Sequence, residues 1–184
     1  EFYYRNKKQR IQKLQVIFMK TRSQKIAVAA MFAALACVAT MIIKIPTPLK
    51  GYVNLGDCVV LLCGSMLSPV YAFLAAAIGS ALADVLSGYM AYAPITFLIK
   101  GLMALVVFAL FKLINKKGLK QPIKILPLVL AEVIMVSGYF IFEGFLYGFV
   151  PSAANIPANA IQGVAGIIFG FVLIKAFEKI KLFK

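Results

Sequence analysis

Five ionisable side chains lie inside long apolar segments of this 184-residue chain: Asp57, Asp84, Lys100, Glu132 and Glu143. A charge in the middle of a membrane-spanning helix costs about 2.5–3.5 kcal/mol on insertion scales, so such a group usually faces a cavity or a partner. Asp84 and Lys100 are expected at matching depths in two consecutive antiparallel segments, which predicts an ion pair between them. The pair would either only lock two helices together or also help to position a ligand.

Further polar residues recur at helical spacing around these groups, near one end of each segment. Residues three, four or seven positions apart lie on one face of a helix. In chain order the polar stripes are Asn54 and Asp57; Ser80, Asp84 and Ser87; Tyr92, Thr96 and Lys100; Tyr139, Glu143 and Tyr147; and Asn155, Asn159 and Gln162. Five stripes at the same end predict a polar pocket, and their amides, hydroxyls, carboxylates and tyrosine rings suit a small polar solute with an aromatic ring.

The composition excludes a water-soluble protein. Apolar residues make up 62% of the chain and charged residues 14%, against about 45–50% and 25% in soluble domains. The 20 Lys and Arg flank apolar segments, which indicates membrane topology rather than nucleic-acid binding. The sequence has no histidine, no phosphate-binding loop and no nucleophile–base pair, so we expect no catalytic residue, no metal site and no cofactor.

The apolar segments predict an all-α membrane protein with six transmembrane helices in a single domain, residues 19–184. Their approximate bounds are 26–45, 53–67, 70–86, 94–114, 125–149 and 156–177. Residues 1–18 precede a methionine that resembles a translation start. They are expected to be either a remnant foreign to the protein or a native basic tail on the membrane surface.

Basic residues concentrate in three regions, before the first segment, between the fourth and fifth, and after the sixth. An even number of spans places all three on one side. The positive-inside rule then predicts cytoplasmic termini and a pocket that opens outward. The loop Lys44–Tyr52, with two prolines and a glycine, is expected to be a lid over this pocket.

The first segment carries small residues at a spacing of four: Ala29 with Ala33, and Ala30 with Ala34. Such a pattern lets another helix approach closely. The partner is either a second membrane protein or another helix of this chain.

Three stretches carry a resemblance to a known family: GYVNLGD at 51–57, IGSALADVLSG at 78–88 and YAPITFLIKGLM at 92–103. Together with six spans they resemble the substrate-binding S components of energy-coupling factor (ECF) vitamin transporters. The resemblance implies an S-component-like bundle in the bacterial cell membrane, which binds a vitamin or precursor from outside. It also implies docking through the first-helix alanines on a transmembrane T component that two separate ATPase subunits drive, so the chain itself is not expected to be an enzyme.

The substrate is expected to be hydroxymethylpyrimidine or pyridoxine, because the chain is most similar to that type of S component. The absence of tryptophan also favours a small ring. Glu143 or Asp57 would accept hydrogen bonds from such a ring. The alternatives are an S component for another vitamin such as riboflavin, a secondary carrier coupled to protons through Asp84 or Glu132, and, less favoured, a membrane enzyme.

Overall fold

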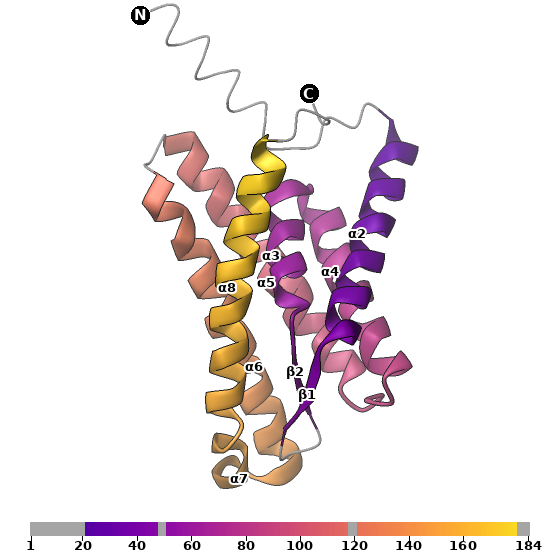
Figure 1. Cartoon of the computed structure of the whole chain (residues 1–184), viewed down its shortest axis with the longest axis vertical. Helices are drawn as coiled ribbons and strands as arrows, with labels where there is room; N and C mark the ends of the chain where they lie inside the picture. Colours follow the sequence, from indigo (N-terminus) through magenta and orange to yellow (C-terminus); the bar gives the residue numbers. More distant parts are fainter. Residues whose placement is uncertain (1–20, 48–50, 118–120, 180–184) are drawn as a thin grey trace, which may run out of the picture.

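The computed structural model describes residues 21–47, 51–117 and 121–179. The prediction for residues 1–18 therefore lies outside the described part of the chain. The elements, in chain order, are α2 (Arg22–Ile42), β1 (Lys44–Pro46), β2 (Tyr52–Asn54), α3 (Asp57–Met66), α4 (Pro69–Leu86), α5 (Ala93–Lys117), a 3-10 turn (Gln121–Ile125), α6 (Leu126–Tyr147), α7 (Phe149–Ala153) and α8 (Ile156–Lys179). Figure 1 shows the long helices packed side by side as one bundle.

Five helical stretches in the described residues are long and apolar enough to cross a membrane. They contain α2, α4, α5, α6 and α8, and their mean hydropathy lies between 1.7 and 2.3. Large apolar side chains such as Met31 and Val172 point outward, with 69% and 59% of their surface exposed. Such outward apolar faces suit lipid, so the prediction of an all-α membrane protein is confirmed.

The predicted second span, residues 53–67, is wrong as a full-length helix. The structure has strand β2 followed by α3, whose 10 residues reach only about 15 Å, half the thickness of a bilayer core. All ten residues of α3 are buried. A short helix and irregular backbone are tolerated at this depth because the rest of the bundle shields them from lipid.

Close backbone approaches hold α3 and α4 in the bundle. Gly64 of α3 lies so close to α5 that an added Cβ would come within 2.5 Å of the Ala104 carbonyl oxygen. Gly79 of α4 would likewise bring a Cβ against the carbonyl oxygen of Ala33 in α2. Part of the small-residue pattern on the first helix therefore serves packing within this chain.

The predicted loop Lys44–Tyr52 contains a hairpin. Strands β1 and β2 pair antiparallel, with Lys44 opposite Asn54 and Pro46 opposite Tyr52. In Figure 1 the hairpin and α7 lie at one end of the bundle, and the start of α2 and the end of α8 lie at the other. The helix ends rich in Lys and Arg are thus opposite the hairpin.

Candidate functional site

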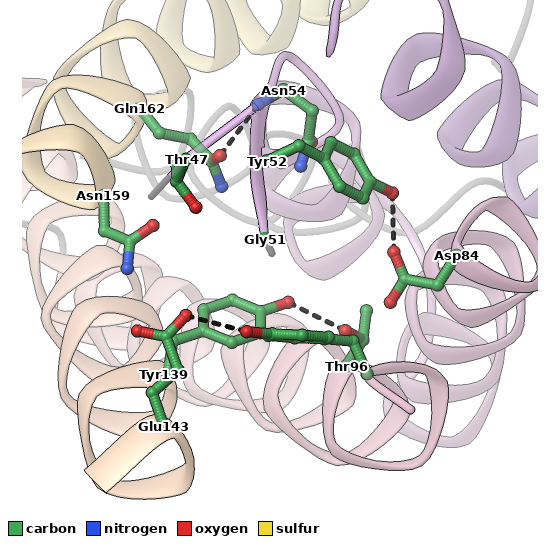
Figure 2. A pocket seen from close by; sticks show the side chains of 11 residues that line it. Thr47, Gly51, Tyr52, Asn54, Asp84, Thr96, Tyr139, Glu143, Asn159 and Gln162 are labelled. Carbon is green, nitrogen blue, oxygen red and sulfur yellow. Dashed lines mark hydrogen bonds between the residues drawn. The ribbon is translucent and has the colours of Figure 1, made fainter. Parts of the chain in front are cut away.

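The hairpin and the ends of four helices surround a polar cavity (Figure 2). Its lining consists of hydroxyl, amide, carboxyl and tyrosine side chains and one glycine: Thr47, Gly51, Tyr52, Asn54, Asp84, Tyr92, Thr96, Tyr139, Glu143, Asn159 and Gln162. The free volume is narrow, about 30 Å³. The polar stripes of α4, α5, α6 and α8 therefore converge on one small space.

Eight of the twelve residues predicted for the pocket line this cavity: Asn54, Asp84, Tyr92, Thr96, Tyr139, Glu143, Asn159 and Gln162. Thr47, Gly51 and Tyr52 also line the cavity but were not predicted, and all three belong to the hairpin segment. The expectation of a lid over residues 44–52 pointed to the segment but not to these side chains. Asp57, Lys100, Tyr147 and Asn155 do not line the cavity.

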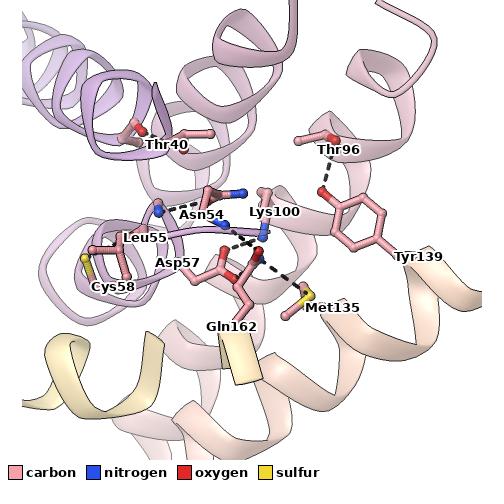
Figure 3. Close-up of polar contacts among 12 residues, drawn as sticks. Thr40, Asn54, Leu55, Asp57, Cys58, Thr96, Lys100, Met135, Tyr139 and Gln162 are labelled. Atoms are coloured by element: carbon pink, nitrogen blue, oxygen red, sulfur yellow. Dashed lines mark hydrogen bonds and ion pairs between the residues drawn. The ribbon is translucent and has the colours of Figure 1, made fainter. Parts of the chain in front are cut away.

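The predicted ion pair between Asp84 and Lys100 is wrong. Lys100 forms its ion pair with Asp57 (Figure 3), and both residues are buried. Because α3 begins inside the bundle rather than at its surface, Asp57 lies deep enough to reach Lys100. Asp84 instead accepts a hydrogen bond of 2.5 Å from the Tyr52 hydroxyl of the hairpin.

The Asp57–Lys100 pair orients two lining side chains from outside the cavity. Gln162 donates from Nε2 to Asp57 Oδ2 (2.6 Å) and accepts at Oε1 from the Asn54 backbone N–H (2.8 Å). The ammonium group of Lys100 also lies 5.5 Å from the centre of the Tyr139 ring, within cation–π range. Tyr139 in turn shares a hydrogen bond of 3.0 Å with Thr96.

Glu143 lies on the side of the cavity opposite Asp84 (Figure 2). Residues of two other segments hold it in place. Asn155 Nδ2 donates to both carboxylate oxygens, at 3.1 and 3.0 Å, and the Tyr92 hydroxyl donates to Oε1 at 3.3 Å. Asn155 therefore fixes a lining group without lining the cavity itself. Tyr147 lies at the end of α6 with 36% of its surface exposed.

The hairpin covers the cavity through Tyr52. Its ring packs on Tyr89, with centres 4.5 Å apart, and its hydroxyl donates to Asp84. Burial and the neighbouring Asp84 carboxylate raise the pKa of Tyr52 well above its ordinary value, so the hydroxyl keeps the proton that it donates. At the rim, Lys44 donates to the Ser87 hydroxyl at 3.0 Å.

Comparison with known proteins identifies the family. A model of the ECF-type riboflavin transporter S component matches residues 20–179, which is most of the chain. The chain belongs to this family. It is also 36% identical over 134 residues to a Pyrococcus woesei protein described as an uncharacterized protein in the gap 3′ region. That match covers 72% of this chain and 87% of the relative.

As an S component, the protein is a membrane-embedded, substrate-binding subunit of a transporter rather than an enzyme. The family implies a vitamin as substrate and an ECF module of T component and ATPases as partners. In the described residues no group of three or more His, Cys, Asp and Glu is placed to hold a metal ion.

Glu132, which belongs to none of the predicted polar stripes, lies in the core of the S component next to the buried ion pair. A Cβ added to Gly166 of α8 would lie 2.6 Å from Glu132 Oε1 and 3.0 Å from Asp57 Cβ. Two glycines of α8, Gly163 and Gly166, leave the room that the glutamate side chain occupies. Glu132 is 4% exposed and does not line the cavity.

The alanines of α2 border an apolar groove on the outside of the S component. Ala29 is buried and Ala33 is half-buried, whereas Ala30 and Ala34 are exposed. The groove has a volume of about 430 Å³ and runs between α2 and α4. It is lined by Ile26, Ala29, Ala30, Ala33, Ala34, Tyr71, Leu74, Ala75, Ile78, Gly79 and Leu82.

Proposed function

We propose that this S component binds a small heterocyclic vitamin or vitamin precursor, of the hydroxymethylpyrimidine or pyridoxine type, in the cavity under the hairpin. The observation that carries the proposal is the lining itself, which combines carboxyl, amide and hydroxyl groups with tyrosine rings around a narrow space. Hydrogen-bonding groups recognise ring substituents and ring nitrogens, and tyrosine faces stack on a flat ring.

Riboflavin is the second candidate, because the matching family model is described as a riboflavin transporter S component. Its three fused rings and ribityl chain are larger than a pyridine or pyrimidine. With a free volume of about 30 Å³, the cavity favours the smaller ligand, since a larger one requires more displacement of the hairpin and of the tyrosines.

The hairpin is proposed to act as the lid. It contributes three lining residues, Thr47, Gly51 and Tyr52. Its contacts with the region around the end of α4 include the Tyr52–Asp84 and Lys44–Ser87 hydrogen bonds and the packing of Tyr52 on Tyr89. Breaking them opens the cavity at the end of the bundle opposite the basic helix ends, which by the positive-inside rule is the outer side.

The exposed part of the α2–α4 groove is proposed as the docking surface for the T component. Ala30 and Ala34 present small side chains to the outside, and the surrounding lining is almost entirely apolar. A helix of another membrane protein can approach such a surface closely, which maximises van der Waals contact where lipid offers no hydrophobic driving force.

Mass spectrometry of the purified protein under native conditions tests the proposal. A bound small molecule with the mass of hydroxymethylpyrimidine or pyridoxine is the expected result, together with a thermal shift on adding that compound to emptied protein. Bound riboflavin would select the second candidate. Uptake by this chain alone in proteoliposomes, abolished by an uncoupler, would instead indicate a proton-coupled secondary carrier.

A further inference from the structure

The two carboxyl groups of the cavity differ in how far their hydrogen-bonding capacity is used. Both oxygens of Glu143 accept from Asn155, and Oε1 also accepts from Tyr92. Asp84 accepts from Tyr52 at Oδ1, and the Thr96 hydroxyl lies near the same carboxyl group. No hydrogen bond reaches Oδ2 from the described residues, although Asp84 is only 4% exposed. A buried carboxylate oxygen without a donor is costly.

Figure 2 shows where this oxygen lies. The Asp84 side chain comes from the α4 wall, with one oxygen joined to Tyr52 and the other on the side of Tyr139 and Thr96. Both of these residues line the same cavity. Oδ2 is thus within the reach of a molecule that enters the cavity.

Among the described residues, no lysine or arginine lines the cavity. Two described lysines near the cavity have partners of their own. Lys100 pairs with Asp57, and Lys44 contacts Ser87 at the exposed rim. An anionic group beside Asp84 and Glu143 would therefore meet two carboxyl groups and, among the described residues, no uncommitted lysine or arginine. Both carboxyl groups are buried, and repulsion between charges is weakly screened in a buried site.

Resting on the proposed function, we propose that Asp84 is a specificity-determining residue of this S component. The part of the ligand that enters the cavity donates an N–H or O–H group to Asp84 Oδ2 and carries no negative charge. Alcohol and amine substituents on the ring are accepted, and the corresponding ring carboxylates are rejected.

The same carboxyl group also joins ligand and lid. Tyr52 of the hairpin occupies Oδ1, so a ligand that donates to Oδ2 makes Asp84 a bridge between the two. Donors on both oxygens would fix the rotamer of Asp84, and a fixed Asp84 holds the Tyr52 hydroxyl in place. Ligand and closed hairpin then stabilise each other.

Matched ligand pairs test the inference on the intact protein in detergent. The pairs are pyridoxine with 4-pyridoxic acid, and hydroxymethylpyrimidine with its 5-carboxylate, each differing only in the oxidation of one hydroxymethyl group. Isothermal titration at pH 7.5 should give affinities at least about 100-fold weaker for the acid of the pair that binds. The ratio of alcohol to acid affinity is measured on the unmodified protein, so it does not depend on whether a substituted protein folds.

Two variants test whether the weaker binding of the acid depends on Asp84. Asp84→Asn removes one negative charge and supplies an N–H donor, so the ratio of alcohol to acid affinity should fall by about tenfold or more. Glu132→Gln is the matched control, a buried carboxyl group outside the cavity lining, and should leave the ratio unchanged. Thermal unfolding of each variant reports whether it is folded.

Results that contradict the role of Asp84 differ from results that contradict the proposed function. Equal affinity for alcohol and acid, or an equal loss of selectivity in Glu132→Gln and Asp84→Asn, would overturn the role of Asp84 while leaving a vitamin-binding S component. Failure of both pairs and of riboflavin to bind would overturn the proposed function and this inference together.

Discussion

Lys100 and Asp57 form a buried ion pair beneath the cavity, and Lys100→Met is expected to destabilise the protein by about 3–5 kcal/mol. The reason is that Asp57, which is fully buried, would be left charged without its partner. The double variant Asp57→Asn, Lys100→Met should recover much of this loss but bind ligand more weakly. Tyr139 loses the cation beside its ring, and Gln162 donates to a neutral amide instead of a carboxylate.

Thermal unfolding and ligand titration of both variants measure the two effects separately. Lys124→Met is the matched control, since Lys124 pairs with Glu178 where both side chains keep some exposure, 11% and 28%. It should cost less than Lys100→Met, because the Glu178 side chain that loses its partner is still 28% exposed to solvent. A double variant with unchanged affinity would show that the pair serves stability alone.

At the scale of elements, the hairpin should open more readily in Tyr52→Phe. The variant keeps the ring contact with Tyr89 but removes the hydroxyl that donates to Asp84. A hydrogen bond to a charged group contributes about 1.5–3 kcal/mol, so bound ligand should dissociate roughly tenfold faster or more. Stopped-flow release measures this rate, with Tyr89→Phe as the control that leaves the Tyr52 hydroxyl intact.

The groove between α2 and α4 gives a second prediction for an element. Ala30→Trp with Ala34→Trp should preserve ligand binding but abolish co-purification with the T component and the ATPases, because the bulky rings prevent close approach of another helix. Val172→Trp on the lipid-exposed face of α8 is the control. If the complex stayed intact in the alanine variants, docking would use another face.

For the whole molecule, the proposed orientation predicts which end meets the outside of the cell. Val150 in α7 is 88% exposed at the hairpin end, and Ser23 lies at the start of α2. A membrane-impermeant maleimide added to intact cells should label Val150→Cys and not Ser23→Cys. The native Cys37, Cys58 and Cys63 are buried, so the unmodified chain provides the background; the reverse labelling pattern would invert the topology.

The long helices could be predicted from the sequence because each presents about twenty apolar residues between polar or proline-containing breaks. The apolar run 53–67 could not be resolved in this way, since a buried strand followed by a short helix has the same composition as a span. The wrong partner predicted for Lys100 has the same cause, because a full-length second span would have kept Asp57 near the surface and out of reach of Lys100. Thr47, Gly51 and Tyr52 were missed because a hairpin has no helical spacing.

The burial of α3 on every side has a consequence for how sequences of this family can diverge. The long helices each have a lipid face, where one apolar residue can replace another with little effect. In α3 all ten residues are buried, and Gly64 has no room for a methyl group. Among close homologues, substitutions should therefore be rare along the whole of Asp57–Met66, without the three-to-four-residue rhythm of tolerant positions expected in α2 or α8.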